Sequence, residues 1–195
     1  MYLLKSRYTE IEEEVADVFE ESGLHDIPID PKRIAEALGY VVVPYSLLSA
    51  DKRNEVMQLS RDGSSELKKD PSTGMLRFYI YYNDSKSHER QRFTIFHEIG
   101  HCKLGHFEER CNLPYEEQES EANHFAKYTM SPNPLIHVLA VSDALDLSDR
   151  FDTSMESANY TFNAYRKWLN CGPDFYLPYE KRILDHFSAE IPSLN

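Results

Sequence analysis

The stretch FTIFHEIGHCKLGH contains two histidines four residues apart, His97 and His101. A glutamate, Glu98, directly follows the first of them. On an α-helix, positions four apart lie one turn apart on nearly the same face, so both imidazoles can reach one ion beside the helix. Glu98 lies about 100° around the helix from His97, where its carboxylate can contact a water molecule on that ion without ligating it. This pattern is typical of metal-assisted hydrolysis, which uses neutral nitrogen ligands and a carboxylate base.

A catalytic zinc ion needs a third protein ligand and an open fourth position, and the next predicted helix offers candidates for that ligand. In EEQESEANHFAKYTMSP, Glu119 and Asn123 are four residues apart. One helix face can therefore present a carboxylate to the metal and an amide that hydrogen-bonds a ligand imidazole. Glu121 is expected to face elsewhere, and Glu116 and Glu117 lie at the helix start, where they favour a capping role.

The elements around the motif strengthen this interpretation, because an isolated His-Glu-x-x-His sequence also arises by coincidence. A helix is predicted from a Ser87 cap to about His106, and the aromatic-rich strand RFYIYYND precedes it. The Glu-x-x-x-Asn helix follows after a short connection, which predicts that the two helices pack against each other. Gly100, with Ala122 and Ala126 on the second helix, is expected to allow a close approach of the two axes.

Composition excludes several classes of protein. The chain has 195 residues, of which 41% are hydrophobic and 28% charged, and no apolar run approaches the length of a membrane helix. The N-terminal stretch MYLLKSRYTEIEEE has too few apolar residues for a signal peptide. Cys102, Cys111 and Cys171 form no C-x-x-C pair and favour free thiols, so we expect a cytoplasmic protein. The net charge of −12 argues against direct nucleic-acid binding.

The remaining pattern predicts an α+β fold. A helix is expected over 9–22, begun by the capping box Thr9-x-x-Glu12 and ended by Gly23, and a shorter one from an Asp30 cap to Gly39. Strands are expected at YVVVPY, NEVMQLS (54–60) and MLRFYIYYN (75–83), with RDGSSELKKDPSTG as an exposed loop. We therefore predict a small mixed or antiparallel sheet packed on the His-Glu-x-x-His helix and the helix after it, followed by an all-helical C-terminal extension.

With these residues in place, the chain resembles the ImmA/IrrE family of gluzincin-like metallopeptidases. The resemblance rests on RFTIFHEIGHCKLGH followed by ESEANHFAKYTMSP, which are similar to the family's paired signature RFTxxHExGHxxxH and ExEANxFAxxxxxP. It covers residues 1–132, more loosely in the N-terminal helices and the FYIYYN strand. The usual LLMP ending of the second motif is altered here, where Tyr128 and Thr129 replace leucines and Ser131 precedes Pro132.

This resemblance implies a zinc peptidase that acts on DNA-binding repressors of mobile elements or stress responses. By position, His97, His101 and Glu119 would bind Zn²⁺, and Glu98 would be the general base. An alternative interpretation is a partner-binding regulatory protein with little or no proteolytic activity, in which the metal holds two helices together. A structural zinc is closed by four protein ligands, whereas a catalytic zinc keeps one position open, so the coordination separates the two interpretations.

The C-terminal part is predicted to be a separate unit. Residues 1–132 would form the metallopeptidase domain, and 133–195 a helix-turn-helix-like extension, because SDRFDTSMESANYTF is similar in rhythm to the family's C-terminal helices. This segment has five Lys or Arg and nine Asp or Glu, a net charge of −4, which argues against a phosphate-binding face. We expect it to dock a protein or to pack, with no nucleic-acid or membrane partner. The oligomeric state stays open.

Substrate binding is assigned to the aromatic strand. FYIYYND is predicted to be an edge strand that pairs with an extended peptide, with Tyr81 and Tyr82 as candidate substrate-binding residues. The oxyanion donor is left open: Tyr81, Tyr82, Tyr128, His124 and His137 can all donate, although packing explains each of them as well.

Two further residues near the motif are given structural interpretations. His106 is interpreted as a histidine at the helix end and Cys102 as a small buried residue.

Overall fold

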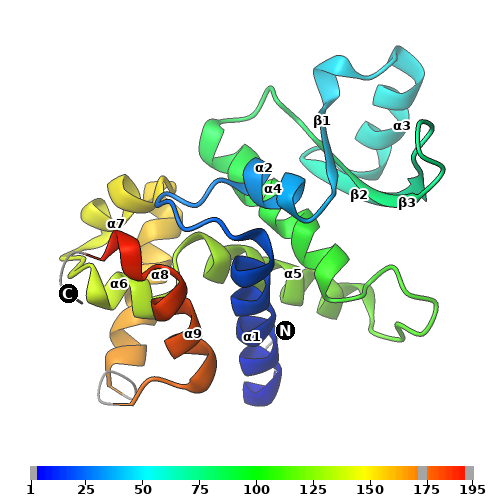
Figure 1. Ribbon diagram of the computed structural model, residues 1–195. Helices are drawn as coiled ribbons and strands as arrows, with labels where there is room; N and C mark the ends of the chain where they lie inside the picture. The colour runs from blue at the N-terminus through cyan, green and yellow to red at the C-terminus, as the bar shows by residue number, and fades with distance from the viewer. Residues whose placement is uncertain (1–3, 171–174, 192–195) are drawn as a thin grey trace.

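The computed structural model describes residues 4–170 and 175–191, which form an α+β fold as predicted (Figure 1). Its strands and α3 lie at one end, helices α6 to α9 lie at the other, and α1, α4 and α5 lie between them. In chain order the helices and strands are α1 (Lys5–Ser22), α2 (Pro31–Ala37), β1 (Val41–Pro44), α3 (Ala50–Leu59), β2 (Gly63–Lys69), β3 (Leu76–Tyr82), α4 (His88–Lys103), α5 (Tyr115–Met130), α6 (Asn133–Val138), α7 (Ala144–Phe151), α8 (Met155–Leu169) and α9 (Pro178–His186).

The sheet is mixed and its strand order is β1-β3-β2. Strand β1 pairs in parallel with β3, and β2 pairs antiparallel with β3 with Gly63 opposite Tyr82. Strand β3 contains FYIYY and is the central strand, so the prediction that this segment forms a sheet edge was wrong. Both of its edges are already hydrogen-bonded to neighbouring strands, which leaves β2 and β1 as the edges of the sheet.

Two predictions between the first and last strands were also wrong. Residues 54–59 of the segment predicted as a strand belong to helix α3. This helix begins after Ser49, whose side chain accepts a hydrogen bond from Lys52 N. The polar segment after it, predicted to be a loop, forms strand β2. Long polar side chains pack on the aromatic residues of β3, as shown by Lys68 Nζ at 4.1 Å from the centre of the Tyr79 ring. Cross-strand packing therefore makes a strand of a sequence with few strand-forming residues.

The N-terminal helices agree with prediction except at one end. Helix α1 starts before Thr9, whose hydroxyl donates to Lys5 O inside the helix, so the proposed capping box was wrong. Gly23 ends this helix with φ 64°, as expected for a left-handed C-cap. Asp30 caps α2 by accepting hydrogen bonds from Lys32 N and Arg33 N, which confirms the predicted start of that helix.

Helix α4 lies between the sheet and α5 and contacts both. Ser87 caps it by accepting a hydrogen bond from Arg90 N. A methyl group added at Gly100 would lie 3.0 Å from Cδ1 of Phe125, which is completely buried on α5. The prediction that Gly100 allows a close approach of two helices is therefore confirmed, and Phe125 is the residue that occupies the space.

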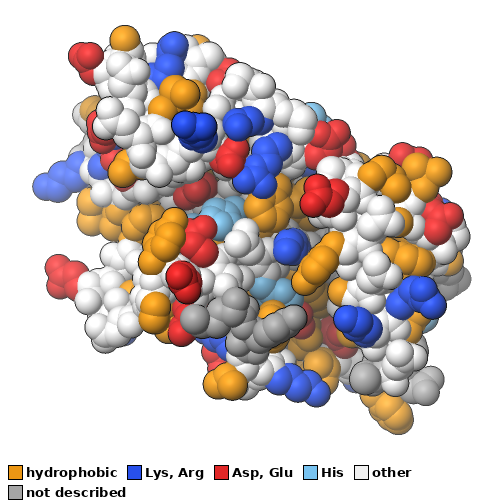
Figure 2. Space-filling model, turned by 180° about the vertical axis from the view of Figure 1, so that it is seen from behind, with side chains coloured by type: hydrophobic (Ala, Val, Ile, Leu, Met, Phe, Trp, Pro, Cys, Tyr) orange, Lys and Arg blue, Asp and Glu red, His pale blue; other side chains and the backbone are white. Residues whose placement is uncertain are grey.

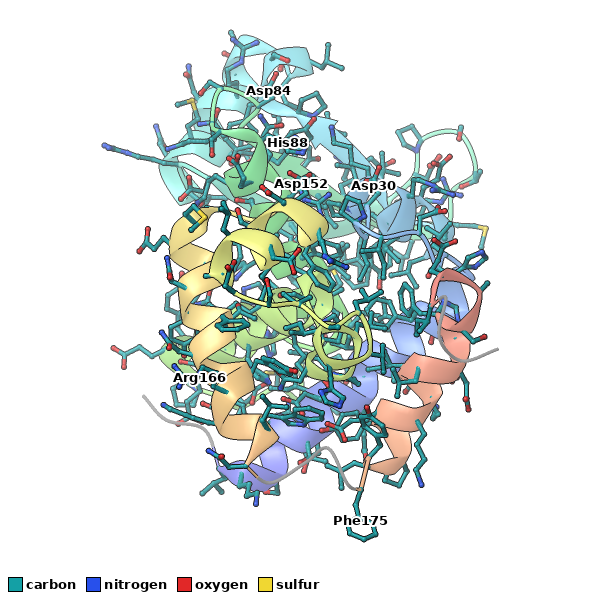
Figure 3. The ribbon with its side chains drawn as sticks, turned by 90° about the vertical axis from the view of Figure 1, so that its left-hand side faces the viewer. Asp30, Asp84, His88, Asp152, Arg166 and Phe175 are labelled. Carbon is teal, nitrogen blue, oxygen red and sulfur yellow. The ribbon has the colours of Figure 1, made fainter. Side chains whose placement is uncertain are left out.

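After Pro132 the described part of the chain contains helices only, as predicted, and these helices share a hydrophobic core with α1, α4 and α5. Polar contacts join the two halves as well. His88 Nε2 lies 2.7 Å from Asp152 Oδ2 (Figure 3). Arg92 Nη2 donates to Phe151 O. The division into domains at 132/133 stays a prediction. Within the described ranges, no helix is long and apolar enough to cross a membrane.

Gly63 is the closest contact between β2 and α4, and it gives a test of this packing. A Cβ atom there would overlap Cγ2 of Thr94 and lie 2.9 Å from Tyr81 O. We expect Gly63→Ala to lower the free energy of unfolding by about 2 kcal/mol, measured by urea titration. Adding Thr94→Ser removes Cγ2 and should restore part of this loss. Unchanged stability of Gly63→Ala would contradict the close contact.

Candidate metal centre

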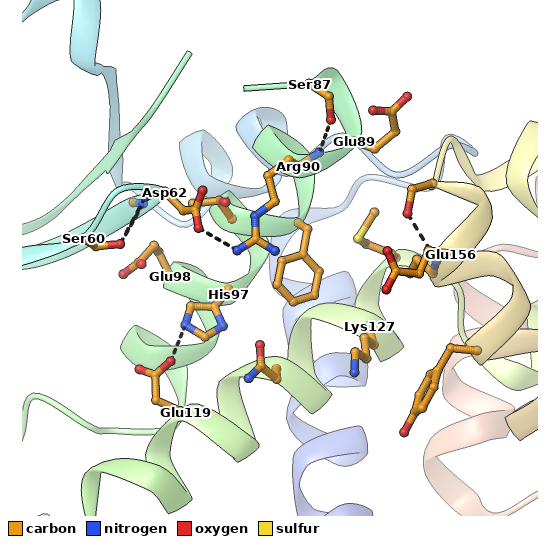
Figure 4. Close-up of a pocket in the computed structure, with 18 residues that line it drawn as sticks. Ser60, Asp62, Ser87, Glu89, Arg90, His97, Glu98, Glu119, Lys127 and Glu156 are labelled. Carbon is orange, nitrogen blue, oxygen red and sulfur yellow. Dashed lines mark hydrogen bonds and ion pairs between the residues drawn. The ribbon is translucent and has the colours of Figure 1, made fainter. Parts of the chain in front are cut away.

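His97 and His101 of α4 and Glu119 of α5 bring three potential ligand atoms within 4.8 Å of one another. The two Nε2 atoms are 3.0 Å apart. Glu119 lies with Oε1 3.3 Å from His101 Nε2. Its Oε2 lies 3.5 Å from His97 Nε2 (Figure 4). Ligand atoms at 2.0–2.1 Å from a tetrahedral zinc ion are about 3.3 Å from each other. The two nitrogens and the Glu119 carboxylate are therefore close enough to share a single ion, and the residue types suit a metal.

The protonation states of these groups also suit metal binding. Burial and the neighbouring His101 lower the pKa of His97 to about 4, although Glu119 acts in the opposite direction. The imidazole of His97 is therefore neutral at pH 7, as a ligand must be. A hydrogen bond with His101 and the charges of the two imidazoles lower the pKa of Glu119 despite its partial burial, so its carboxylate is ionised.

Glu98 lies beside this cluster and is held by the sheet. Ser65 Oγ on β2 donates to Glu98 Oε2 at 2.5 Å. Burial raises the pKa of Glu98, with the Ser65 hydrogen bond acting against the shift. A carboxyl group with a raised pKa next to a metal position is suited to accept and return a proton near neutral pH.

Asn123 lies one turn after Glu119 and lines the same cleft as His97. The Asn123 side chain acts to raise the pKa of His97, whereas burial lowers that pKa. Nδ1 of His97 is nevertheless buried and has no hydrogen-bond partner within residues 4–170 and 175–191. A hydrogen bond in which His97 Nδ1 donates to the Asn123 side chain therefore stays a prediction.

The cluster lies in a cleft of about 760 Å³ between the start of β2, α4, α5 and the start of α8. Histidine atoms are visible in the depth of this cleft, between acidic and basic side chains (Figure 2). Asp62 and Gly63 line one wall, His97 and Glu119 lie deeper, and Tyr160 lines the wall formed by α8. The metal position is therefore open to a large molecule.

Tyr81 and Tyr82, predicted to bind substrate, do not line this cleft. Tyr81 is only 2% exposed and donates a hydrogen bond to Glu66 Oε1 on the sheet face opposite α4. Tyr82 belongs to the main core. The prediction depended on β3 being an edge strand, and the central position of that strand removes its basis.

The other candidate oxyanion donors also do not line this cleft. His124 lies 2.9 Å from Glu12 Oε1, and His137 lies 3.1 Å from the Tyr165 hydroxyl. Tyr128 is buried in the core. Cys102 is buried with its thiol pKa raised by that burial, in agreement with the structural role predicted for it.

His106 has a role that sequence analysis missed. Gly105, with φ 73°, ends α4, and the chain turns back so that His106 N donates to His101 O. His106 Nδ1 then lies 2.8 Å from His101 Nδ1, and its Nε2 lies 3.1 Å from Glu121 Oε2. The interpretation of His106 as a helix-end residue was wrong, because its side chain is only 2% exposed and faces a ligand histidine. Only the glycine before it signals this turn in the sequence.

The hydrogen bonds beyond His106 determine which ring nitrogen of His101 is free. Arg7 donates to both oxygens of Glu121, at 2.7 and 2.6 Å. Burial acts to raise the pKa of Glu121, but the hydrogen bonds from Arg7 and His106 outweigh it and lower that pKa, so the carboxylate is an acceptor. His106 must then donate through Nε2 and accept at Nδ1 from His101. This leaves the lone pair of His101 Nε2 directed at the cluster.

Fold and site together define a metallopeptidase-type protein, with a His-Glu-x-x-His helix packed on a helix that carries a glutamate. The chain belongs to the Peptidase_M78 family, described as the IrrE N-terminal-like domain, whose model matches residues 38–163. This confirms the resemblance to ImmA/IrrE proteins. The match begins after α2 and continues into α8, so it includes β2 and both helices of the site. No curated protein is similar enough to the chain to count as a relative.

The hydrogen-bond chain through His106 gives a test that is independent of catalysis. We expect His106→Ala to weaken Zn²⁺ binding by about 10- to 100-fold, because His101 loses the acceptor that orients it. His106→Gln can both accept and donate and should lose less. Competition with a chromophoric chelator measures the affinity, and circular dichroism checks the fold. Equal affinity of the alanine variant and the wild type would contradict the orienting role.

Proposed function

We propose that the protein is a zinc-dependent endopeptidase whose substrate is a protein, a DNA-binding transcriptional repressor. The single observation that supports this proposal is the spacing of His97, His101 and Glu119, which fits one tetrahedral ion with Glu98 beside it in an open cleft. Family membership supports a metallopeptidase-type activity. The net charge of −12 favours a basic partner, and DNA-binding proteins are commonly basic.

Each residue then has a defined part in hydrolysis. Zn²⁺ held by the three ligands would supply Lewis-acid activation of water and of the peptide carbonyl. Glu98 accepts a proton from the water as its oxygen attacks the carbonyl carbon. The same carboxyl group returns this proton to the amide nitrogen as the C–N bond breaks, which yields a carboxylic acid and an amine. Ser65 keeps the Glu98 side chain oriented through its hydrogen bond.

Strand β2 is the sheet edge on which the substrate would lie. Asp62 O accepts from Asn83 N and so points toward β3. Because backbone groups alternate along an antiparallel strand, those of Gly63 and Ser65 point away from β3. Gly63 N indeed donates to Ser60 Oγ rather than to β3. An extended peptide that pairs with this edge would pass over Glu98 and the ligand histidines.

The number of protein donors favours a catalytic centre over a structural one. The cluster within the described ranges contains three residues, His97, His101 and Glu119. A structural zinc site uses four protein ligands, whereas a catalytic site uses three and keeps one position open. The free thiols of Cys102 and Cys111 support a reducing compartment, so we also propose that the protein acts in the cytoplasm.

Replacement of the proposed base tests the mechanism. We expect Glu98→Gln to bind zinc but to cleave the repressor-like protein encoded nearest to this gene about 10²- to 10⁴-fold more slowly, because no carboxylate takes the proton. Glu89→Gln is the matched control, since Glu89 lines the same cleft near the start of the same helix. Product formation by electrophoresis and mass spectrometry gives the rate. Cleavage at an unchanged rate by Glu98→Gln would refute the assignment of the base.

Replacement of a ligand tests the metal site itself. We expect His97→Ala to lose stoichiometric zinc after dialysis, because two protein ligands hold the ion much more weakly than three. His88→Ala, a change at the exposed start of the same helix, should keep its zinc. Elemental analysis of both purified variants decides the point. Full zinc content in His97→Ala would show that the metal binds elsewhere.

A further inference from the structure

One wall of the cleft carries a positive charge that the proposed chemistry does not use. Lys127 is on α5, one turn after Asn123 and two turns after Glu119, and it lines the cleft together with both. The Cα atoms of Lys127 and Glu119 are therefore about 12 Å apart along the helix axis. The labelled side chains of Lys127 and Glu119 are both directed into the cleft from this helix (Figure 4).

Lys127 has no carboxylate partner in the part of the chain that the structure describes. Its Nζ lies 4.4 Å from the centre of the Tyr160 ring, a cation-π contact with the wall formed by α8. Partial burial lowers the pKa of Lys127, and no carboxylate acts to raise it. The ammonium group therefore loses part of its hydration without gaining an ion pair.

Arg90, the other basic residue that lines the cleft, does have a carboxylate partner. Arg90 Nη2 lies 2.7 Å from Asp62 Oδ2, so its charge is compensated inside the protein. Glu156 of α8 also lines the cleft but forms no ion pair with Lys127 in the structure. Lys127 is thus the lysine or arginine of this cleft whose charge is available to a ligand.

A second, smaller cavity meets the cleft at the same residue. Lys127, Asn123 and Tyr160 line both, so the cleft continues past the metal centre at this point. An extended peptide advances about 3.3 Å per residue, so a span of about 12 Å corresponds to three or four residues. A substrate that pairs with the β2 edge, passes the metal centre and continues along α5 would bring a side chain three or four positions from the cleaved bond to the Lys127 side chain.

We propose that Lys127 selects the substrate by binding the carboxylate of an aspartate or glutamate three or four residues from the scissile bond. This inference rests on the proposed peptidase function for the direction in which the substrate lies. It makes the cleft selective for a segment that has an acidic residue, within a partner that is basic overall.

The first experiment measures binding and does not require cleavage. Zinc-loaded Glu98→Gln protein is applied to arrays of randomised short peptides in which one position is fixed as Asp, Asn or Lys. At one position we expect Asp peptides to bind roughly five- to tenfold more tightly than Asn peptides, as for a partly buried ion pair. Adding Lys127→Gln should reduce this ratio to about one, and adding Lys127→Glu should favour Lys peptides instead.

Lys32→Gln is the matched control for this series. Lys32 also lies over a tyrosine ring, with its Nζ 4.9 Å from the centre of Tyr82, but it is on α2 and outside the cleft. We expect this change to leave the Asp-to-Asn ratio as it is. Circular dichroism of every variant shows whether the fold is retained.

The second experiment uses wild-type protein and the same peptide sets in solution, with the ratio of kcat/KM values as readout. A ratio that Lys127→Gln leaves unchanged, in binding and in cleavage, overturns the proposal for Lys127. If the wild type cleaves no peptide but still prefers Asp through Lys127, the carboxylate site stands and the peptidase function fails. If the wild type cleaves the peptides but shows no preference that depends on Lys127, the peptidase function stands and the carboxylate site fails.

Discussion

The close packing of α4 on α5 is the constraint on which the rest of the site depends. His97 and His101 come from one helix and Glu119 from the other, so the distance between the axes sets whether the three can share one ion. Gly100 favours a short distance, because a Cβ atom there would lie only 3.0 Å from the Phe125 ring. The candidate metal position thus depends on a hydrophobic contact within two helical turns of the proposed ligands.

The same centre is supported from two further directions. Strand β2 approaches α4 closely at Gly63, and this brings Ser65 within hydrogen-bond distance of Glu98. On the other side, Arg7 of α1 and Glu121 of α5 fix His106, which in turn orients His101. Catalytic groups need support of this kind because their geometry must be held within fractions of an ångström. Segments that carry none of the ligands therefore contribute to their placement.

The features that were predicted correctly from sequence are those encoded by local spacing. The His-x-x-x-His and Glu-x-x-x-Asn pairs identify two helices and the side chains that share one face of each, since the period of a helix is fixed. Strand β2 was missed because its polar residues become a strand only by pairing with β3. His106 was missed because its position follows from the turn at Gly105 and from a partner on another helix. Strand order and such turns depend on tertiary contacts, which a single sequence does not display.

The wall of the cleft opposite the sheet comes from α8. The residues proposed to select the substrate are therefore partly on a different element from those proposed to hydrolyse it. The proposed ligands and base all lie on α4 and α5, whereas Tyr160, which packs on Lys127, comes from the C-terminal helices. Those helices are anchored to α4 by contacts such as that of Arg92 with Phe151 O, so their position is tied to the helix that carries the histidines. Substitutions on α8 can therefore change which side chains the cleft accepts while the separations between His97, His101 and Glu119 stay the same, because no ligand comes from α8.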